Sequence, residues 1–471
     1  MSNTYLLIDF GSTFTKVTAV ECNPTAILGR AQSPTTVSTD IALGMETAIE
    51  ILIRSTGRTD LLYATKLACS SAAGGLRLVV CGLVPRLTSE AGRRAALGAG
   101  AKVVGVFSYI LSCDDIEAIE ELSPDILLLA GGTDGGDRKV VLANSHSLAA
   151  SKLTCPFVVA ANQSVASELV RVLEAAGKDA RKVANVMPEF GRLEVEPARE
   201  AIRNVFIERI VKAKGLQGVQ QHLSSPIIPT PMAVLRGAEI LSEGYGSEIG
   251  LGDLLLVDVG GATTDVDSVA SGNPTDPGIQ ARGLPEPHAK RTVEGDLGIR
   301  FNAGHILEMA GESSLRAHAL LAGIGEAAGE AIDLANHVAE LGREVSTLPS
   351  GSFAYGIDVA LARTAVEYAV SRHAGCIEVM HLGDGDVSLL RGKDLRKVAT
   401  VVGTGGIMAY GHNPRHVLAG AFYSNTQPLS LRPVAPRMLV DSLYIFYATG
   451  LLAEVQPEAA VRLQKISLRE I

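Results

Sequence analysis

The chain has 471 residues, and 42 Lys and Arg against 51 Asp and Glu give a formal charge of −9. This acidic balance disfavours binding to nucleic acid or to an anionic membrane, because phosphate-rich partners require a basic surface. At about 100–200 residues per domain, the length predicts several domains. Trp is absent, whereas Gly occurs 49 times, so the positions of the glycines are worth following.

The N-terminal segment has no basic region and reaches an acidic residue at Asp9, which is not typical of a signal peptide. No apolar stretch of about 18 residues predicts a membrane span. The six cysteines are spread along the chain without CxxC spacing, which favours reduced thiols over a disulfide framework or a zinc site. We therefore expect a cytoplasmic chain.

The chain opens with short apolar runs separated by turns. Residues 6–8, 17–20 and 26–28 predict three consecutive strands, which is typical of an antiparallel meander. A helix follows with apolar residues on one face, capped at its start by Thr39 or Asp40 and ended by Gly57.

From about residue 76 the pattern alternates between strands and helices, which predicts a parallel α/β unit. Ser-Cys-Asp before one of these helices makes Asp114 the expected cap. The predicted strands are 78–80, 103–107, 126–129 and 157–159, and the predicted helices are 89–98, 114–122 and 165–176.

The second half begins with a predicted helix over 229–240 and then repeats the opening, with a strand over 254–257, an acid, a glycine turn and a returning strand. This weak duplication suggests two lobes of one architecture. Ala-rich helices are predicted over 316–342 and 357–374, and a hairpin over 377–390. The predicted domains are residues 1–75 (first part of lobe I), 76–225 (inserted α/β subdomain), 226–250 (connecting helix returning to lobe I) and 251–471 (lobe II).

The first chemical motif follows the first strand and combines an acid with a small turn and a cation. Glycine lets backbone N–H groups approach phosphate oxygens, hydroxyls add donors and lysine adds a point charge. The acid would hold Mg²⁺ through water. Alone, the motif also fits an ordinary hairpin. Its residues are Asp9, Gly11, Ser12, Thr13 and Lys16.

The second motif repeats this arrangement after the strand at 254–257, and a third, glycine-rich motif lies near residue 405. Glycines after a strand and before a helix permit close packing of a nucleoside, and a helix N-terminus favours anions. The second motif comprises Asp258, Gly260, Gly261, Thr263, Thr264 and Asp265, and the third comprises Gly403, Thr404, Gly405 and Gly406.

In order and spacing these motifs resemble the phosphate-1, phosphate-2 and adenosine motifs of the actin-like ATPase superfamily, and residues 229–238 resemble its connecting helix. The resemblance implies an α/β protein with two ribonuclease H-like lobes and an inserted parallel α/β subdomain in the first lobe. Neither the P-loop nor the dinucleotide-binding fingerprint occurs.

A narrower resemblance covers nearly the whole chain. It looks like the accessory protein of methylaspartate (glutamate) mutase, regarded as the ATP-dependent reactivating factor of an adenosylcobalamin-dependent carbon-skeleton mutase. Segments 129–136 and 292–298 and the tail 441–452 carry it, beside the second and third motifs. The glycine loop at 131–136 reads equally well as a functional loop or as a tight turn.

The resemblance implies binding of ATP and Mg²⁺ in a cleft between the lobes, hydrolysis coupled to lobe movement, and a mutase as protein partner. Asp9 and Asp258 are the expected metal acids. Asp258, Asp265 or the pair Glu294 and Asp296 would orient the attacking water, and the residues leave this choice open. No cobalamin-binding signature occurs. Two alternatives remain, a small-molecule kinase of this fold and a nucleotide-binding scaffold that does not hydrolyse ATP.

Overall fold

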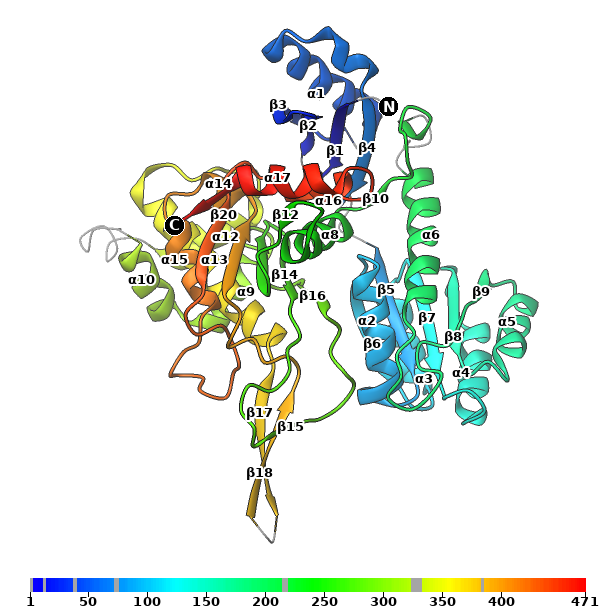
Figure 1. Cartoon of the computed structure of the whole chain (residues 1–471). Helices are drawn as coiled ribbons and strands as arrows, with labels where there is room; N and C mark the ends of the chain where they lie inside the picture. The colour runs from blue at the N-terminus through cyan, green and yellow to red at the C-terminus, as the bar shows by residue number, and fades with distance from the viewer. Residues whose placement is uncertain are drawn as a thin grey trace. The chain divides into compact units, whose positions relative to one another are not determined.

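The structure is a computed structural model that describes residues 3–11, 14–36, 40–71, 76–213, 219–322, 333–382 and 385–471 (Figure 1). Its contacts divide the chain into two compact units. The first unit is Met1–Ala233 with Gly283–Pro285, and the second is Val234–Arg282 with Glu286–Ile471. The predicted four-part domain division stays a prediction.

The first sheet of the first unit has the strand order β3-β2-β1-β4-β10. Its first three strands are antiparallel, as the meander pattern predicted, and β4 and β10 run parallel to β1. Helix α1 (Ile41–Thr56) packs its apolar face against this sheet, capped by Asp40 and ended by Gly57 in the left-handed conformation. The strands are β1 (Thr4–Phe10), β2 (Phe14–Cys22), β3 (Thr25–Pro34), β4 (Thr65–Ser70) and β10 (Ile228–Pro229).

The main sheet of the second unit repeats this topology in the order β16-β14-β13-β19-β20-β21. Its first three strands are again antiparallel, and β19 and β20 again run parallel to the central strand. The duplication predicted from the sequence is therefore present, with two sheets of the ribonuclease H-like kind. The strands are β13 (Leu254–Val259), β14 (Thr264–Val269), β16 (Ala289–Glu294), β19 (Thr400–Thr404), β20 (Arg437–Asp441) and β21 (Leu468–Glu470).

A third, fully parallel sheet lies in the sequence between β4 and β10, in the order β6-β5-β7-β8-β9. Alternate residues of its buried strands enter two apolar clusters, so helices cover both faces, as parallel sheets require. Helices α2 and α6 cover one face, and α3, α4 and α5 cover the other. The strands are β5 (Arg77–Gly82), β6 (Lys102–Ser108), β7 (Ile126–Gly131), β8 (Phe157–Ala161) and β9 (Ala180–Lys182). The helices are α2 (Glu90–Gly98), α3 (Cys113–Glu121), α4 (Lys139–Ala150), α5 (Ala166–Ala175) and α6 (Glu196–Ala213).

Helices of the second unit pack on one face of its main sheet, where α13 forms the centre of the apolar cluster. The predicted helix over 316–342 is not continuous: α10 ends at Leu321 and α12 begins at Leu334, with residues 323–332 outside the described ranges. These helices are α9 (Ala303–Ala310), α10 (Glu312–Leu321), α12 (Leu334–Arg343) and α13 (Gly351–His373).

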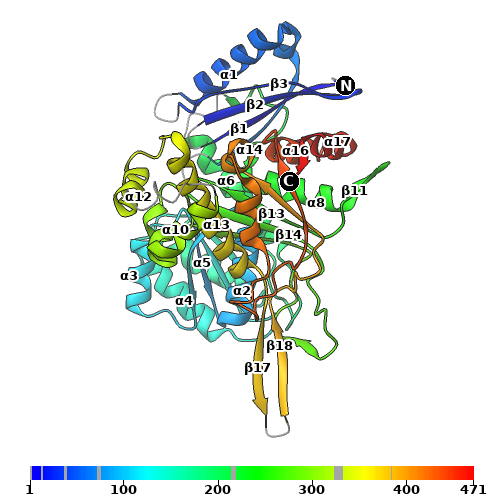
Figure 2. The same cartoon turned by 90° about the vertical axis from the view of Figure 1, so that its left-hand side faces the viewer.

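The predicted hairpin is present as β17 (Cys376–Leu382) and β18 (Gly385–Arg391), with β15 (Ile279–Ala281) beside it. It extends away from the main sheet of its unit in both views (Figure 2). Residues 383 and 384 of its predicted turn lie outside the described ranges.

The remaining elements are short or lie next to the motifs. These elements are η1 (Thr59–Tyr63), η2 (Pro85–Ser89), α8 (Thr230–Glu243), β11 (Gly244–Tyr245), β12 (Glu248–Ile249), α14 (Gly406–Tyr410), α15 (Pro414–Leu418), η3 (Ala419–Ala421), α16 (Phe446–Leu452) and α17 (Pro457–Ser467). No helix of the described ranges is long and apolar enough to span a bilayer.

Candidate functional site

The first acid, Asp9, lies at the carboxyl end of β1 and is almost fully buried. The β1–β2 register places Lys16 directly opposite it, and the Lys16 Nζ lies 3.4 Å from the Asp9 Oδ2. The hydroxyl of Thr230 donates a hydrogen bond of 2.7 Å to the Asp9 Oδ1. The carboxylate is therefore fixed from two sides, with a cation next to it.

The glycine after this strand has no room for a side chain. The backbone N–H of Gly11 donates to the Phe14 carbonyl at 3.1 Å, and a Cβ at Gly11 would lie 2.5 Å from that oxygen. The tight turn thus explains Gly11. Ser12 and Thr13, the hydroxyl residues of the predicted motif, lie outside the described ranges.

Two neighbours of Asp9 were not singled out by sequence reasoning. Thr230 follows the two-residue strand β10, and Cys69 lies in β4 with its Sγ 3.6 Å from the Asp9 Oδ1. Burial first, and then the charge of Asp9, raise the pKa of the Cys69 thiol well above its usual value, so it stays protonated. The carboxyl ends of parallel strands meet at one sheet edge, and a hydroxyl residue directly after a strand was the available signal.

In the second unit, the second and third motifs come together through strand pairing. Asp258 lies opposite Asp265 in β14 and opposite Thr404 in β19. A Cβ at Gly405 would lie 2.5 Å from the Val259 carbonyl and 2.9 Å from the Asp258 Oδ1, and Gly405 has a φ of 100°. Glycine is therefore required where the two motifs approach each other.

The turn of the second motif is held from outside by the segment that follows β16. The carbonyls of Gly260 and Gly261 accept hydrogen bonds from the backbone N–H groups of Ile299 and Arg300 at 3.2 and 2.9 Å. Thr264 is buried, and its hydroxyl donates to the Leu297 carbonyl at 2.7 Å. This hydroxyl is thus directed into the core.

The two acids of β14 differ in their partners. Asp265 accepts two hydrogen bonds from the guanidinium of Arg291 at 3.1 and 2.5 Å and one from the Thr263 hydroxyl at 3.0 Å. Asp267 is 1% exposed, and its Oδ1 has no hydrogen-bond partner within the described ranges. Burial raises the pKa of Asp267 well above its usual value, although Arg291 opposes this shift.

Asp267 was missed by sequence reasoning. The signal was its spacing from Asp265, because residues two apart on a strand share a face.

Glu294 and Asp296 share one cation from α13. The Arg372 Nη1 donates to the Glu294 Oε2 at 2.7 Å and to both Asp296 carboxylate oxygens at 2.9 Å. His305 lies 3.4 Å from Asp296 as well. Burial alone would lower the pKa of the Arg372 guanidinium, but its hydrogen bonds to both acids outweigh this effect, and the pKa is raised. The structure brings this predicted pair together on an arginine.

The third motif continues the parallel strand β19 into α14. The buried Thr404 hydroxyl donates to the Asp441 Oδ2 at 3.0 Å, and Asp441 also accepts the backbone N–H groups of Ile445 and Phe446 at 2.8 and 3.1 Å. Burial raises the pKa of Asp441 against these hydrogen bonds. Asp441 thus joins the glycine motif to the start of the tail, whose part in the site had no signal beyond the family resemblance. The remaining glycines of this motif differ in surroundings: Gly403 packs against Met408 and Leu418, and Gly406 opens into free space.

Within the described ranges, no group of three or more His, Cys, Asp or Glu side chains is arranged to hold a metal ion. Mg²⁺ commonly keeps several waters and takes one or two carboxylates together with substrate phosphates. Asp9 in the first unit and Asp258 in the second each place one carboxylate at the end of a central strand, and a single carboxylate beside water and phosphate is the kind of ligand that Mg²⁺ takes.

The glycine loop at 131–136 is a firmly bonded turn at the carboxyl end of β7. Asn185 donates to the Gly132 carbonyl and to the Asp134 carboxylate, both at 2.9 Å, and Asn162 accepts from the Gly135 N–H at 3.1 Å. Gly132 has a φ of 70°. The conformation of the turn explains its glycines.

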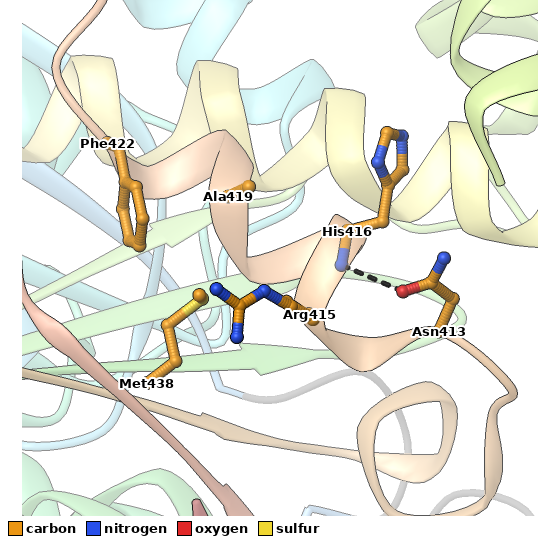
Figure 3. A pocket seen from close by; sticks show the side chains of 6 residues that line it. All are labelled: Asn413, Arg415, His416, Ala419, Phe422 and Met438. Atoms are coloured by element: carbon orange, nitrogen blue, oxygen red, sulfur yellow. Dashed lines mark hydrogen bonds between the residues drawn. The ribbon is translucent and has the colours of Figure 1, made fainter. Parts of the chain in front are cut away.

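A pocket of about 370 Å³ lies beside α15, lined by Asn413, Arg415, His416, Ala419, Phe422 and Met438 (Figure 3). The Arg415 side chain extends toward Met438, whereas the His416 ring points away from both. Arg415 also donates to the Ile471 carbonyl at 2.9 Å. None of the predicted motif residues lines this pocket.

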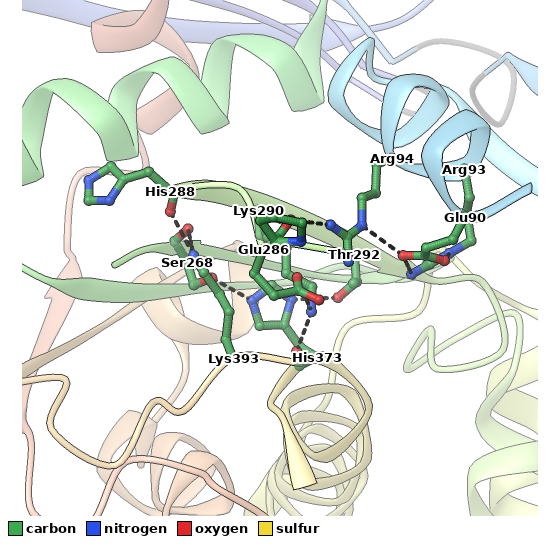
Figure 4. Close-up of polar contacts among 11 residues, drawn as sticks. Glu90, Arg93, Arg94, Ser268, Glu286, His288, Lys290, Thr292, His373 and Lys393 are labelled. Carbon is green, nitrogen blue, oxygen red and sulfur yellow. Dashed lines mark hydrogen bonds and ion pairs between the residues drawn. The ribbon is translucent and has the colours of Figure 1, made fainter. Parts of the chain in front are cut away.

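A buried polar network ties the strands of the second unit to α13 (Figure 4). The fully buried Lys393 donates to the His288 carbonyl at 2.6 Å and to the Ser268 hydroxyl at 3.2 Å. The His373 ring bridges the Ser268 and Thr292 hydroxyls at 2.8 Å each. These groups satisfy one another inside the core, so their role is structural.

Comparison with known proteins gives one family and one curated relative. Residues 5–468 match a family model described as MutL protein. The chain is 42% identical over 461 residues to a protein named Protein MutL from Clostridium tetanomorphum, covering 98% of each chain.

Similar solved structures include three distant cases. They are a glycerol dehydratase reactivase (11% identity, covering 96% of this chain and 100% of that chain, TM-score 0.33), the ethanolamine utilization protein EutJ from Carboxydothermus hydrogenoformans (10%, 97% and 89%, 0.27) and a gluconate kinase from Lactobacillus acidophilus (9%, 100% and 93%, 0.35). Scores this low do not bear on function.

Proposed function

The chain belongs to the MutL family, and from this premise we propose that it is an ATP-hydrolysing accessory protein of an adenosylcobalamin-dependent carbon-skeleton mutase. The partner is of the glutamate (methylaspartate) mutase type, and hydrolysis drives release of damaged cobalamin from it. The mutase assignment is supported by segments 129–136 and 292–298 and the tail 441–452, which resemble the accessory-protein family.

One observation carries the proposed nucleotide chemistry. Each unit has a sheet of the same strand order, and in each the central strand ends in an acid followed by a glycine turn and an antiparallel strand. These acids are Asp9 in β1 and Asp258 in β13. Two equivalent acids before two phosphate-compatible turns favour binding of a polyphosphate with a divalent cation.

The side chains divide the proposed work between them. Asp9 and Asp258 are the acids that would hold Mg²⁺, and Lys16 would supply positive charge to the phosphates. Gly11 and Gly260 would let the backbone of each turn approach phosphate oxygens closely, while their own N–H groups donate within the turns. A bound Mg²⁺ would neutralise charge that develops on the transferred phosphoryl group.

The third motif is proposed to take the nucleoside. Gly406 has open space where a side chain would project, and Gly405 brings the motif's backbone against Asp258. A base and ribose can lie flat against backbone only where side chains are absent.

Asp258, Asp265 and the pair Glu294 and Asp296 stay the candidate acids for orienting the attacking water. Asp265 is paired with Arg291, and Glu294 and Asp296 are paired with Arg372.

The experiment that tests the proposal uses the full chain with an adenosylcobalamin mutase that has been inactivated in turnover. We expect mutase activity to return only when the chain, Mg-ATP and fresh coenzyme are all present. Substitution of ATP by a non-hydrolysable analogue should prevent recovery. Lack of recovery with a glutamate mutase type partner, despite measurable ATPase activity, would contradict the accessory role for that partner.

The two alternatives give different results in the same preparation. A small-molecule kinase would consume ATP only when an acceptor hydroxyl compound is supplied. A scaffold would bind ATP without releasing phosphate. Phosphate release by the chain alone, or with the mutase, distinguishes the proposed ATPase from both.

A further inference from the structure

Five ionisable side chains of the second unit, none of them in the three motifs, gather where α10, α13 and α15 meet. We name them the α10–α13–α15 cluster: His318 of α10, Arg363 and Glu367 of α13, His416 of α15, and Arg432 of the segment before β20. The two imidazole rings lie edge to face with centroids 5.9 Å apart, and Glu367 lies 4.0 Å from the Arg432 guanidinium. None of these residues belongs to the proposed nucleotide site.

Arg432 forms the base of the cluster and is 1% exposed. Its Nη1 donates to the Gly420 carbonyl at 3.3 Å. Its Nε and Nη2 have no hydrogen-bond partner within the described ranges. Leaving donors of a buried guanidinium unsatisfied is costly, and Arg offers them in a planar fork that matches oxyanions.

The other basic groups add further unpaired nitrogen atoms. The Arg363 Nη1 donates to the His416 carbonyl at 2.8 Å. Within the described ranges, the Arg363 Nε, the His318 Nδ1 and the His416 Nε2 are buried without partners. Arg363, Glu367 and both histidines are only half-buried as residues, so the cluster lies near the protein surface.

The charge of the cluster also favours an anion. Burial, and then the charge of Arg363, lower the pKa of both histidines, that of His416 to about 4. The imidazoles are therefore neutral at pH 7, and the fixed charges are two arginines against one glutamate. Water could satisfy the hydrogen bonds but not this excess positive charge.

We infer that the α10–α13–α15 cluster is a binding site for a tetrahedral oxyanion, a phosphate group, held by Arg432 at its base and by Arg363 and the two histidines around it. The inference does not depend on the proposed ATPase activity. The anion would make the hydrogen bonds that Arg432 and Arg363 lack, and it would balance the excess positive charge.

The test is an NMR titration of the full chain, with ¹³C-labelled histidine, in chloride buffer with increasing inorganic phosphate. We expect saturable shifts of the His318 and His416 resonances, and a rise in the apparent pKa of His416, because a nearby anion favours the charged imidazole. The single variants His318→Gln and His416→Gln assign the resonances. Saturation of other resonances while these two stay unmoved would overturn the inference.

Two variants remove the proposed ligands one at a time. Arg432→Met and Arg363→Gln should each weaken phosphate binding at least about tenfold, the loss expected for a charge-assisted hydrogen bond. Arg415→Met is the matched control, because Arg415 is adjacent to His416 in α15 but extends toward Met438 (Figure 3). If Arg432→Met does not fold, Arg363→Gln carries the test. Equal affinity in Arg363→Gln and the control would contradict the site.

Thermal unfolding gives a second readout. Phosphate should raise the Tm of the wild-type chain, since a ligand that binds only the native state stabilises it. The rise should survive Asp258→Ala, which alters the nucleotide site, and disappear in Arg432→Met and Arg363→Gln. A rise lost only in Asp258→Ala would locate phosphate at the nucleotide site and refute the inference without affecting the proposed function.

The same measurements separate a free ion from a phosphorylated compound. Inorganic phosphate is the first probe, and O-phosphoserine is the second. Shifts with inorganic phosphate alone indicate a site for the free ion, and tighter binding of O-phosphoserine indicates a phosphomonoester. Both results support the oxyanion site, and no response of His318 and His416 to either probe rules it out.

Discussion

At the scale of single residues, the acids of the motifs differ in what holds their carboxylates. Asp9 is fixed by Thr230 and Lys16, and Asp265 is paired with Arg291. Asp258 lies against the backbone of Gly405. Acids in similar motifs therefore have different partners, because strand register and neighbouring elements bring different side chains to each of them.

We predict that Asp9→Ala and Asp258→Ala each lower kcat for Mg-ATP hydrolysis by about 100-fold or more, the loss typical of a missing electrostatic contact to the transition state. The physical reason is loss of a metal-holding carboxylate at the end of a central strand. Phosphate release measured against Mg²⁺ concentration checks this. Asp386→Ala on the exposed hairpin is the control, and normal turnover in both site variants would contradict the phosphate-loop assignment.

A second prediction at this scale concerns pH. The pKa of His416 is lowered to about 4 in the folded chain, whereas the unfolded value is about 6.5. As pH falls below about 6.5 the unfolded state takes up a proton that the folded state does not, so stability falls until about pH 4.

His416→Gln should therefore lose less stability between pH 7 and pH 5 than the wild type, by about 1–2 kcal/mol after allowance for solvent screening. Urea unfolding in phosphate-free buffer at both pH values measures the difference. His381→Gln controls for loss of an exposed imidazole. A parallel decline in wild type and His416→Gln would show that this histidine does not contribute.

At the scale of elements, helix α13 fixes the segment that holds the second phosphate turn. Arg300 donates two hydrogen bonds to Asp358 of α13, at 3.0 and 2.6 Å, while its backbone N–H binds the Gly261 carbonyl at 2.9 Å. Burial raises the pKa of Asp358 although Arg300 opposes it. The helix thus reaches the glycine turn through one buried ion pair.

We predict that Asp358→Asn lowers the free energy of unfolding by about 3 kcal/mol, because removal of one partner leaves a buried charge uncompensated. The double variant Arg300→Met with Asp358→Leu should recover most of this loss. Denaturant unfolding measures both. Removal of the surface pair Arg316 and Glu312 is the control and should cost at most about 0.5 kcal/mol. If Asp358→Asn matches that control, the buried pair does not anchor α13.

The observed ends of the helices show which helix caps the local sequence predicts correctly. The first helix is capped by Asp40, one of the two residues predicted for this position, and ends at Gly57 as predicted, because both caps act within one turn. The helix at Cys113–Glu121 is capped by Ser112 in a capping box and not by Asp114. In return, the Asp115 carboxylate accepts a hydrogen bond from the backbone N–H of Ser112. The cap therefore depended on which of several adjacent polar side chains bonds to the first turn of the helix.

At the scale of the whole molecule, the chain contains two compact units with separate apolar clusters. The clusters around β1 and the parallel sheet belong to the first unit, and the cluster around α13 belongs to the second. Multidomain chains commonly depart from two-state unfolding. A substitution that destabilises the apolar core of one unit should therefore promote unfolding of that unit and leave the other unit folded.

We predict that Asp358→Asn increases amide hydrogen exchange in β13, β14 and α13 but leaves β1, β2 and α1 unchanged, since local opening follows cooperative units. Exchange followed by mass spectrometry on the full chain measures this. Uniform acceleration in both units would show instead that the chain unfolds as one cooperative body.

The sequence by itself determined the local features and the repeated order of strand, acid and glycine turn. Spacing was sufficient there because turns and caps are made by neighbouring residues. It also indicated the duplicated lobes and the inserted parallel unit, because hydrophobic periodicity follows the elements. These predictions needed no knowledge of contacts between distant residues.

Only the tertiary structure decided which carboxylates are paired and which polar atoms are left without partners. Thr230 binds Asp9 from 221 residues away, and Arg372 reaches Glu294 from 78 residues away. Such contacts arise from strand register and helix packing, which place residues together regardless of their separation in sequence. The unsatisfied atoms of Arg432 and Asp267 were decided at this level too, because an unsatisfied atom is defined by its surroundings, although the spacing of Asp267 from Asp265 did place the two acids on one face of the strand.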